Sequence, residues 1–233
     1  PVNSFDILPM SNSIDVAVRD GDDITALHEW NNRLLQFKKK SLYIINIARD
    51  VEILEGKYDG KGLFHPHAAV RTDFGIAWVN KQSAWLYNGS RIIDMLSGRN
   101  GERLISQSVW SNIVHEGDNT PTSVGYSAKY KCFIVDPNAD ETALNHAYVY
   151  DFNTSSWSGH PDSIPDASSH GRTNWVQRWD GEAMYMDYNG VFHYFRNDFA
   201  SVEGSENWLS TVLLQKILYL IVLSARKRFM RFI

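Results

Sequence analysis

The fold class is indicated by the stretch Ala84-Trp85-Leu86-Tyr87-Asn88-Gly89-Ser90-Arg91-Ile92-Ile93. Two short runs of aromatic and branched residues flank an Asn-Gly pair, which is the strongest short signature of a β-hairpin turn. Asn189-Gly190 repeats this arrangement, and Asp180-Gly181 and Asp20-Gly21 have similar turn chemistry. The sequence therefore predicts antiparallel hairpins, with Gly89 and Gly190 at positive φ because glycine tolerates that region.

Further runs of this kind fill most of the chain and alternate with clusters of Asn, Asp, Gly and Ser. We expect an all-β domain with at least twelve short antiparallel strands within residues 14–196. The expected strands are 14–18, 24–30, 34–38, 42–47, 68–71, 75–79, 84–87, 91–94, 123–128, 132–136, 146–151, 175–179, 183–187 and 191–196.

A weak repeat runs through these hairpins. Its anchors are Leu42-Tyr43-Ile44, Trp85-Leu86-Tyr87, Tyr148-Val149-Tyr150 and Phe192-His193-Tyr194, at steps of about 43, 63 and 44 residues. Four strands per ~40–50 residues is the period of a β-propeller blade. The pattern predicts an antiparallel β-propeller, or part of one, with about four blade-like units and an insertion around residues 101–121. A β-sandwich with irregular hairpins is the alternative.

Charge divides the 233 residues into two parts. The chain carries a net charge of −4, with about −9 in residues 1–208 and +5 in residues 209–233. We expect a propeller-like domain over 1–208 and an apolar, basic segment over 209–233. A net acidic chain does not favour nucleic-acid binding. One cysteine, Cys132, excludes an intrachain disulfide and a cysteine-built zinc site, and its apolar run predicts a buried thiol.

The C-terminal segment contains an apolar run, Val212–Ala225, which is interrupted by Gln215 and Lys216. A membrane-spanning helix needs about 20 apolar residues, so we do not expect insertion into a membrane. The segment either packs on the body or a partner, or is an altered end that is foreign to the domain. Residues 1–20 lack the features of a signal peptide, and the start at Pro1 indicates processing or a fragment.

Two stretches carry a family resemblance. Gly21-Asp22-Asp23-Ile24-Thr25-Ala26-Leu27 leads into Asn32-Arg33-Leu34-Leu35-Gln36-Phe37, and Thr72-Asp73-Phe74-Gly75-Ile76-Ala77-Trp78-Val79 leads into Ala84–Gly89. They resemble strand pairs of β-propeller proteins in tailed-phage virions. The run Tyr148–Trp157 is more loosely similar to kelch-type propellers, although the kelch Gly-Gly doublet is missing. The virion resemblance implies a structural component of a phage tail or head–tail connector.

Few residues indicate a catalytic or metal-binding site. His65-Pro66-His67 places two imidazoles on one face, but no third metal ligand stands at motif spacing. The loop Asp136–Asp140 departs from the EF-hand pattern, and we expect it and Asp20–Asp23 to be solvated turns, with an irregular cation site as the alternative. We therefore predict no catalytic, metal or cofactor site. The remaining candidates for a binding surface are four tryptophans, which could instead fill the gaps between sheets: Trp110, Trp157, Trp175 and Trp179.

The sequence thus favours a non-catalytic structural or assembly protein of a phage virion. Its expected partners are portal, adaptor or tail proteins and further copies of itself, in a virion assembled in the host cytoplasm. The alternative is a carbohydrate- or receptor-binding propeller, followed by a propeller-scaffold glycoside hydrolase, because carboxylate pairs are spatial and leave no local motif.

Overall fold

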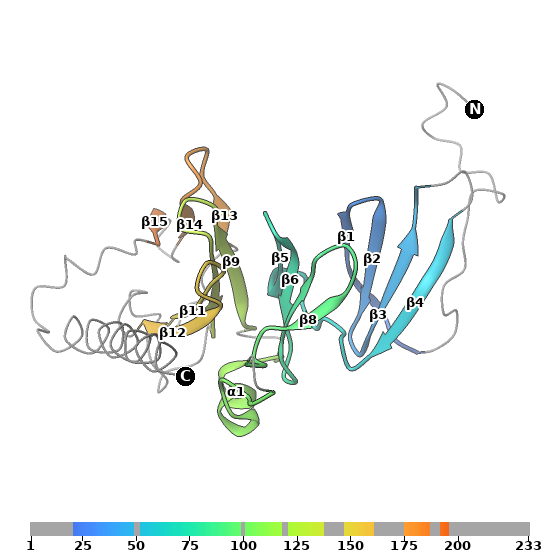
Figure 1. Ribbon diagram of the computed structural model, residues 1–233, viewed down its shortest axis with the longest axis horizontal. Coiled ribbons are helices and arrows are strands. Elements are labelled where there is room, and N and C mark those ends of the chain that lie inside the picture. Colours follow the sequence, from blue (N-terminus) through green and yellow to red (C-terminus); the bar gives the residue numbers. More distant parts are fainter. Residues whose placement is uncertain are drawn as a thin grey trace, which may run out of the picture. The chain divides into compact units, whose positions relative to one another are not determined.

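The computed structural model describes residues 21–48, 52–98, 101–117, 121–137, 147–160, 175–186 and 192–195, which all lie in one compact unit, Pro1–Phe195. These residues form four antiparallel sheets (Figure 1). The predictions for residues 14–18, Asn189-Gly190 and the segment 209–233 lie outside the described residues. The all-β class is confirmed, and the described residues contain fifteen strands.

Each sheet consists of strands that are consecutive in the chain. The first contains β1 (Ile24–Trp30), β2 (Arg33–Lys38), β3 (Ser41–Asn46) and β4 (Ile53–Asp59), and the second β5 (Ala69–Thr72), β6 (Gly75–Val79), β7 (Ala84–Tyr87) and β8 (Ile92–Asp94). The third contains β9 (Ser123–Ser127), β10 (Cys132–Asp136), β11 (Ala147–Asp151) and β12 (Ser156–His160), and the fourth β13 (Val176–Gln177), β14 (Ala183–Met186) and β15 (Phe192–Tyr194).

The predicted repeat matches this arrangement. Its four anchors fall on β3, β7, β11 and β15, which are the third strands of the four sheets. The longest step contains α1 (Gln107–Ile113), which lies within the expected insertion, and a short 3₁₀ turn, η2 (Pro66–Ala68), precedes β5. No helix in the described ranges combines the length and the apolar character needed to cross a membrane.

Turn chemistry differs from the expectation at one hairpin. Gly89 has φ +95°, as predicted, but the β7–β8 loop runs over four residues and is held by the Asn88 side chain, whose Oδ1 accepts from the amides of Ser90 and Arg91 at 3.0 Å. The two-residue turn with positive φ at both positions lies instead at Asn31 and Asn32, with φ of 51° and 58°. Asparagine adopts this conformation more readily than most residues, so Asn-Asn serves here without glycine.

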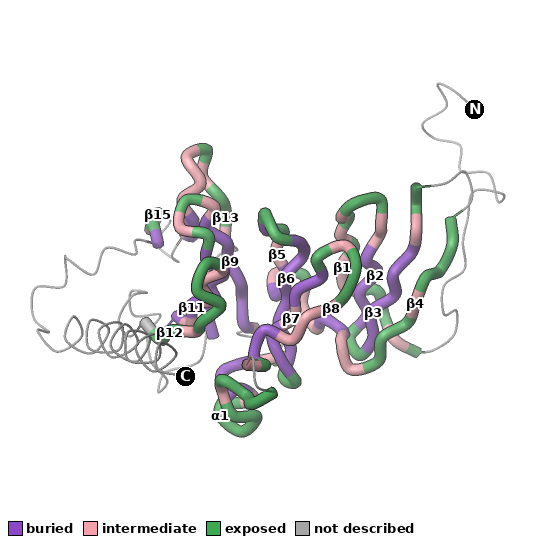
Figure 2. Tube along the Cα trace, viewed as in Figure 1, coloured by how far each residue is buried: buried purple, intermediate pink, exposed green. Residues whose placement is uncertain are grey.

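In the middle sheets, strands β6, β9 and β10 are buried along their whole length (Figure 2). The first core joins sheets one to three, and the second joins sheets three and four. On β10, Phe133 and Val135 belong to the first core while Cys132 and Ile134 belong to the second. This double burial explains why β10 reads as an unbroken apolar run, whereas β4 is largely exposed.

Neighbouring sheets in the chain contact each other in order: β1 touches β6, β5 touches β9, and β9 touches β13 and β14. Between the first two sheets, the Phe37 and Trp78 rings meet edge to face at 5.1 Å. Between the second and third, the Tyr126 hydroxyl donates to Asp73 Oδ2 at 3.0 Å. Burial first, and then this hydrogen bond, raises the pKa of Tyr126 well above its ordinary value.

Candidate functional site

The four candidate tryptophans differ in burial. Trp110 is fully buried on α1, where its indole N–H donates to the Asn80 carbonyl at 2.9 Å. Its ring meets Trp157 edge to face at 5.5 Å. Trp110 is therefore a core residue and offers no binding surface, which is the alternative that the sequence left open.

Trp157 and Trp175 also pack between sheets. Trp157 is half-buried, and its N–H donates to the Met95 carbonyl at 2.9 Å. Trp175 lies over Gly125, where an added Cβ would come within 2.7 Å of the indole, and its ring contacts Tyr185 at 4.8 Å. Both rings join neighbouring sheets, which is the alternative that the sequence left open.

Trp179 is different, because 88% of its surface is exposed. It lies in the loop 178–182 between β13 and β14, which two short backbone hydrogen bonds close. The Arg178 amide donates to the Glu182 carbonyl at 2.8 Å, and the Gly181 amide donates to the Arg178 carbonyl at 2.9 Å. Gly181 has φ +86°, a conformation that suits glycine at the end of such a turn.

Arg178 holds this loop through its side chain. Its guanidinium lies 5.5 Å from the Trp179 ring centre and 5.3 Å from that of Tyr194, within the range of cation–π contacts. Its Nε is 3.6 Å from Asp180 Oδ2, and its Nη1 is 4.0 Å from Glu182 Oε2. Two rings and two carboxylates therefore fix the guanidinium beside the exposed indole.

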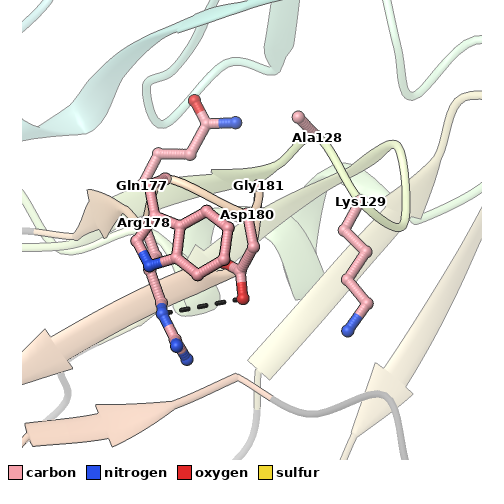
Figure 3. Close-up of a pocket in the computed structure, with 7 residues that line it drawn as sticks. Ala128, Lys129, Gln177, Arg178, Asp180 and Gly181 are labelled. Atoms are coloured by element: carbon pink, nitrogen blue, oxygen red, sulfur yellow. Dashed lines mark ion pairs between the residues drawn. The ribbon is translucent and has the colours of Figure 1, made fainter.

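An open hollow of about 530 Å³ lies beside Trp179 (Figure 3). The β13–β14 hairpin forms one wall through residues 177–181, and the β9–β10 turn forms the other through Ala128 and Lys129. The Gly181 carbonyl accepts from the Lys129 amide and from Ser127 Oγ, both at 3.1 Å, and Lys129 Nζ pairs with Glu182. The two walls are thus tied together.

The fourth sheet also has an apolar outer face, defined here as Val176, Met184, Phe192 and Tyr194. The register aligns Val176 with Met184 and Met184 with Tyr194, and side chains two residues apart share a face. Exposure is 54% at Val176, 59% at Phe192 and 39% at Tyr194. Tyr194 also contacts Arg178, so the outer face meets the loop that carries Trp179.

The other predicted candidates form no reactive constellation. The His65 and His67 rings stack at 5.2 Å, and burial, followed by the charge of His65, lowers the pKa of His67. No group of three His, Cys, Asp or Glu side chains suited to a metal occurs among the described residues. Residues 138–140 and Asp20 lie outside those residues. Cys132 is buried, and burial raises the pKa of its thiol to about 12.

Sequence reasoning missed the outer face and the position of Arg178. The alternation of Val176 with Gln177 and of Met184 with Tyr185 was a signal for two different faces, but these strands are too short to show which one is covered. The Arg178–Tyr194 contact joins residues of different strands and leaves no local pattern.

Comparisons with known proteins give little further information. No protein-family model matches the chain, and no curated protein matches it. Among solved structures, it is similar to the extracellular domain of a proposed one-component system from B. thetaiotaomicron, with a TM-score of 0.43 and 11% identity. That alignment covers 76% of this chain, which spans only 21% of the length of the other.

Proposed function

We propose that this chain is a non-catalytic assembly protein whose four sheets are consecutive blades of a β-propeller, and that it acts through protein–protein contacts in a phage virion. The observation that carries the proposal is the exposed outer face of the fourth sheet. A large apolar patch on a soluble protein marks an interaction site.

The propeller interpretation is supported by the way in which the sheets pack. Each of the first three sheets turns an apolar face towards an aromatic face of the next sheet. Leu35 and Ile44 lie on the side of Trp78, Ala77 and Val79 on the side of Phe133, and Cys132 and Ile134 on the side of Tyr185. First strands also lie next to each other, since β5 contacts β9 and β9 contacts β13. This is the packing expected of blades around an axis.

The outer face continues this series. Its Val, Met, Phe and Tyr side chains stand where the previous sheets present the face that the next sheet covers. We therefore expect the partner that covers the outer face to be another antiparallel sheet with an aromatic side, from a portal, adaptor or tail protein. Fully burying one large apolar side chain contributes about 1.5–3 kcal/mol, and burial of the exposed Val176, Phe192 and Tyr194 would each supply part of that.

The virion assignment comes from the phage-like stretches, which form β1 with β2 and β6 with β7. Assembly in the host cytoplasm, partner virion proteins and further copies of the chain belong to the same proposal.

The test places a photo-cross-linking amino acid at position 192 in the tagged full chain and isolates virions from infected cells. We expect the chain in the particle, cross-linked to a β-strand of another virion protein. The matched control is position 109, since Val109 is 49% exposed on α1 and lies off the outer face. A chain absent from purified particles contradicts the virion role. A cross-link only to a second copy, or to the chain's own remaining residues, contradicts the proposal that another virion protein covers the outer face.

A further inference from the structure

We propose that the hollow beside Trp179 binds a neutral sugar unit, with the indole as its stacking platform. This goes beyond the assembly role, because it assigns a ligand to a different surface. Three observations carry it: the fixed exposure of the ring, the polar lining of the hollow and its balanced charge.

The exposed indole is held ready for a ligand. Hydrogen bonds close the loop, the Gly181 carbonyl ties it to the β9–β10 turn, and Arg178 lies against the Trp179 ring at 5.5 Å. With 88% of Trp179 exposed, a large apolar surface remains open to stacking. A site that is ordered before binding loses less entropy when the ligand arrives, so this arrangement favours affinity.

The lining of the hollow favours a polyol over an apolar partner. Figure 3 shows Gln177 and Lys129 reaching out from opposite sides of the hollow, with the Arg178–Asp180 ion pair near Gln177. An amide and an ammonium donate hydrogen bonds, while an amide and a carboxylate accept them. Sugar hydroxyls need both kinds of group, whereas the strong anchor points of protein interfaces lie in well-packed, desolvated pockets.

Charge and size narrow the ligand further. Arg178 pairs with Asp180 and Glu182, and Lys129 pairs with Glu182, so two cations face two carboxylates. An anionic sugar would find no excess of positive charge here. The hollow of about 530 Å³ is open to solvent, which suits a sugar unit that lies on the surface of the domain.

The experiment screens the full chain against neutral gluco-, manno-, galacto- and chito-oligosaccharides, with sialyllactose and heparin fragments as anionic probes. Titration calorimetry follows for each sugar that binds. We expect a neutral sugar to bind, Trp179→Ala to weaken it tenfold or more, and Trp179→Phe to recover part of the loss. Raising salt from about 0.05 M to about 0.5 M should leave the affinity nearly unchanged, because no net charge is neutralised.

Phe192→Ser is the matched control, since it removes an exposed ring from the outer face and leaves the hollow intact. It should bind sugar like the parent chain, whereas a virion-assembly defect would appear only in that variant. Binding of none of the neutral sugars overturns the proposal, as does a Trp179→Ala protein that retains full affinity. Binding confined to anionic probes overturns the neutral class.

Discussion

Trp157 on β12 donates its indole N–H to the backbone carbonyl of Met95 at 2.9 Å, which links the third sheet to the segment that follows β8. Trp157→Phe keeps most of the ring but removes the donor, so it should cost about 1 kcal/mol in the free energy of unfolding. Trp157→Ala also leaves a cavity and should cost about 3–5 kcal/mol. Urea unfolding of both variants measures the difference. Equal losses would mean that the hydrogen bond, and not the ring, dominates.

The hydrogen bond between Tyr126 and Asp73 joins the second and third sheets, and its loss should be measurable. Tyr126→Phe should destabilise the protein by about 1 kcal/mol, because it removes the hydroxyl that donates to Asp73, while the exposed carboxylate is rehydrated. Asp73→Asn keeps an acceptor oxygen and should cost less. A chemical denaturation series resolves the two, and a larger loss in Asp73→Asn would contradict the assigned geometry.

Gly75 and Gly89 should tolerate substitution poorly. Gly89→Val places a β-branched residue at φ +95° and should cost 1 kcal/mol or more. Gly75→Ala should cost more, because its Cβ would lie 1.9 Å from the Tyr87 carbonyl oxygen. Gly117→Ala is the control, since an added Cβ there meets nothing within 4 Å. If Gly117→Ala had a lower melting temperature than Gly75→Ala and Gly89→Val, the turn assignments would be wrong.

Cys132 should give the protein a stability that depends on alkaline pH. The folded thiol has a pKa of about 12 and the unfolded thiol about 9, so the unfolded state loses its proton first as pH rises. Its stabilising contribution is complete below pH 9 and is lost on the way to pH 12. The loss of unfolding free energy between about pH 8 and pH 10.5 should therefore be larger in the parent chain than in Cys132→Ala.

The same burial should make the thiol slow to react, since the thiolate is the reactive form. Rapid labelling of Cys132 by a thiol reagent in the folded protein would contradict the burial of this thiol. Cys132→Ala should itself cost roughly 1 kcal/mol in packing.

How far the sequence could predict the fold depended on burial. Strands such as β6 and β10 are covered on both faces and read as apolar runs, so their bounds were predicted as the structure has them. The strand β4 was missed because Glu55, Gly56 and Lys57 on an exposed edge give no apolar alternation. The helix α1 buries only Trp110 and Ile113, which is too short a pattern to indicate a helix.

The candidate site was less predictable, for a tertiary reason. Trp175 and Trp179 lie four residues apart in similar polar surroundings, yet one packs over Gly125 and the other faces solvent. The absence of a Cβ on Gly125 makes room for Trp175, and nothing near Trp179 reveals this difference. The sequence alone identified both tryptophans as candidates but could not show which of them is exposed.

Consecutive residues of β10 serve two separate cores, with Phe133 on one side and Ile134 on the other. Unfolding of the sheets is therefore coupled between nearest neighbours, as in a linear array of repeats. Among the described residues, the two cores connect the fourth sheet to the first by way of β10 and its neighbours. The third sheet thus acts as the relay of folding cooperativity, and a change there should disturb the melting of both halves of the molecule at once.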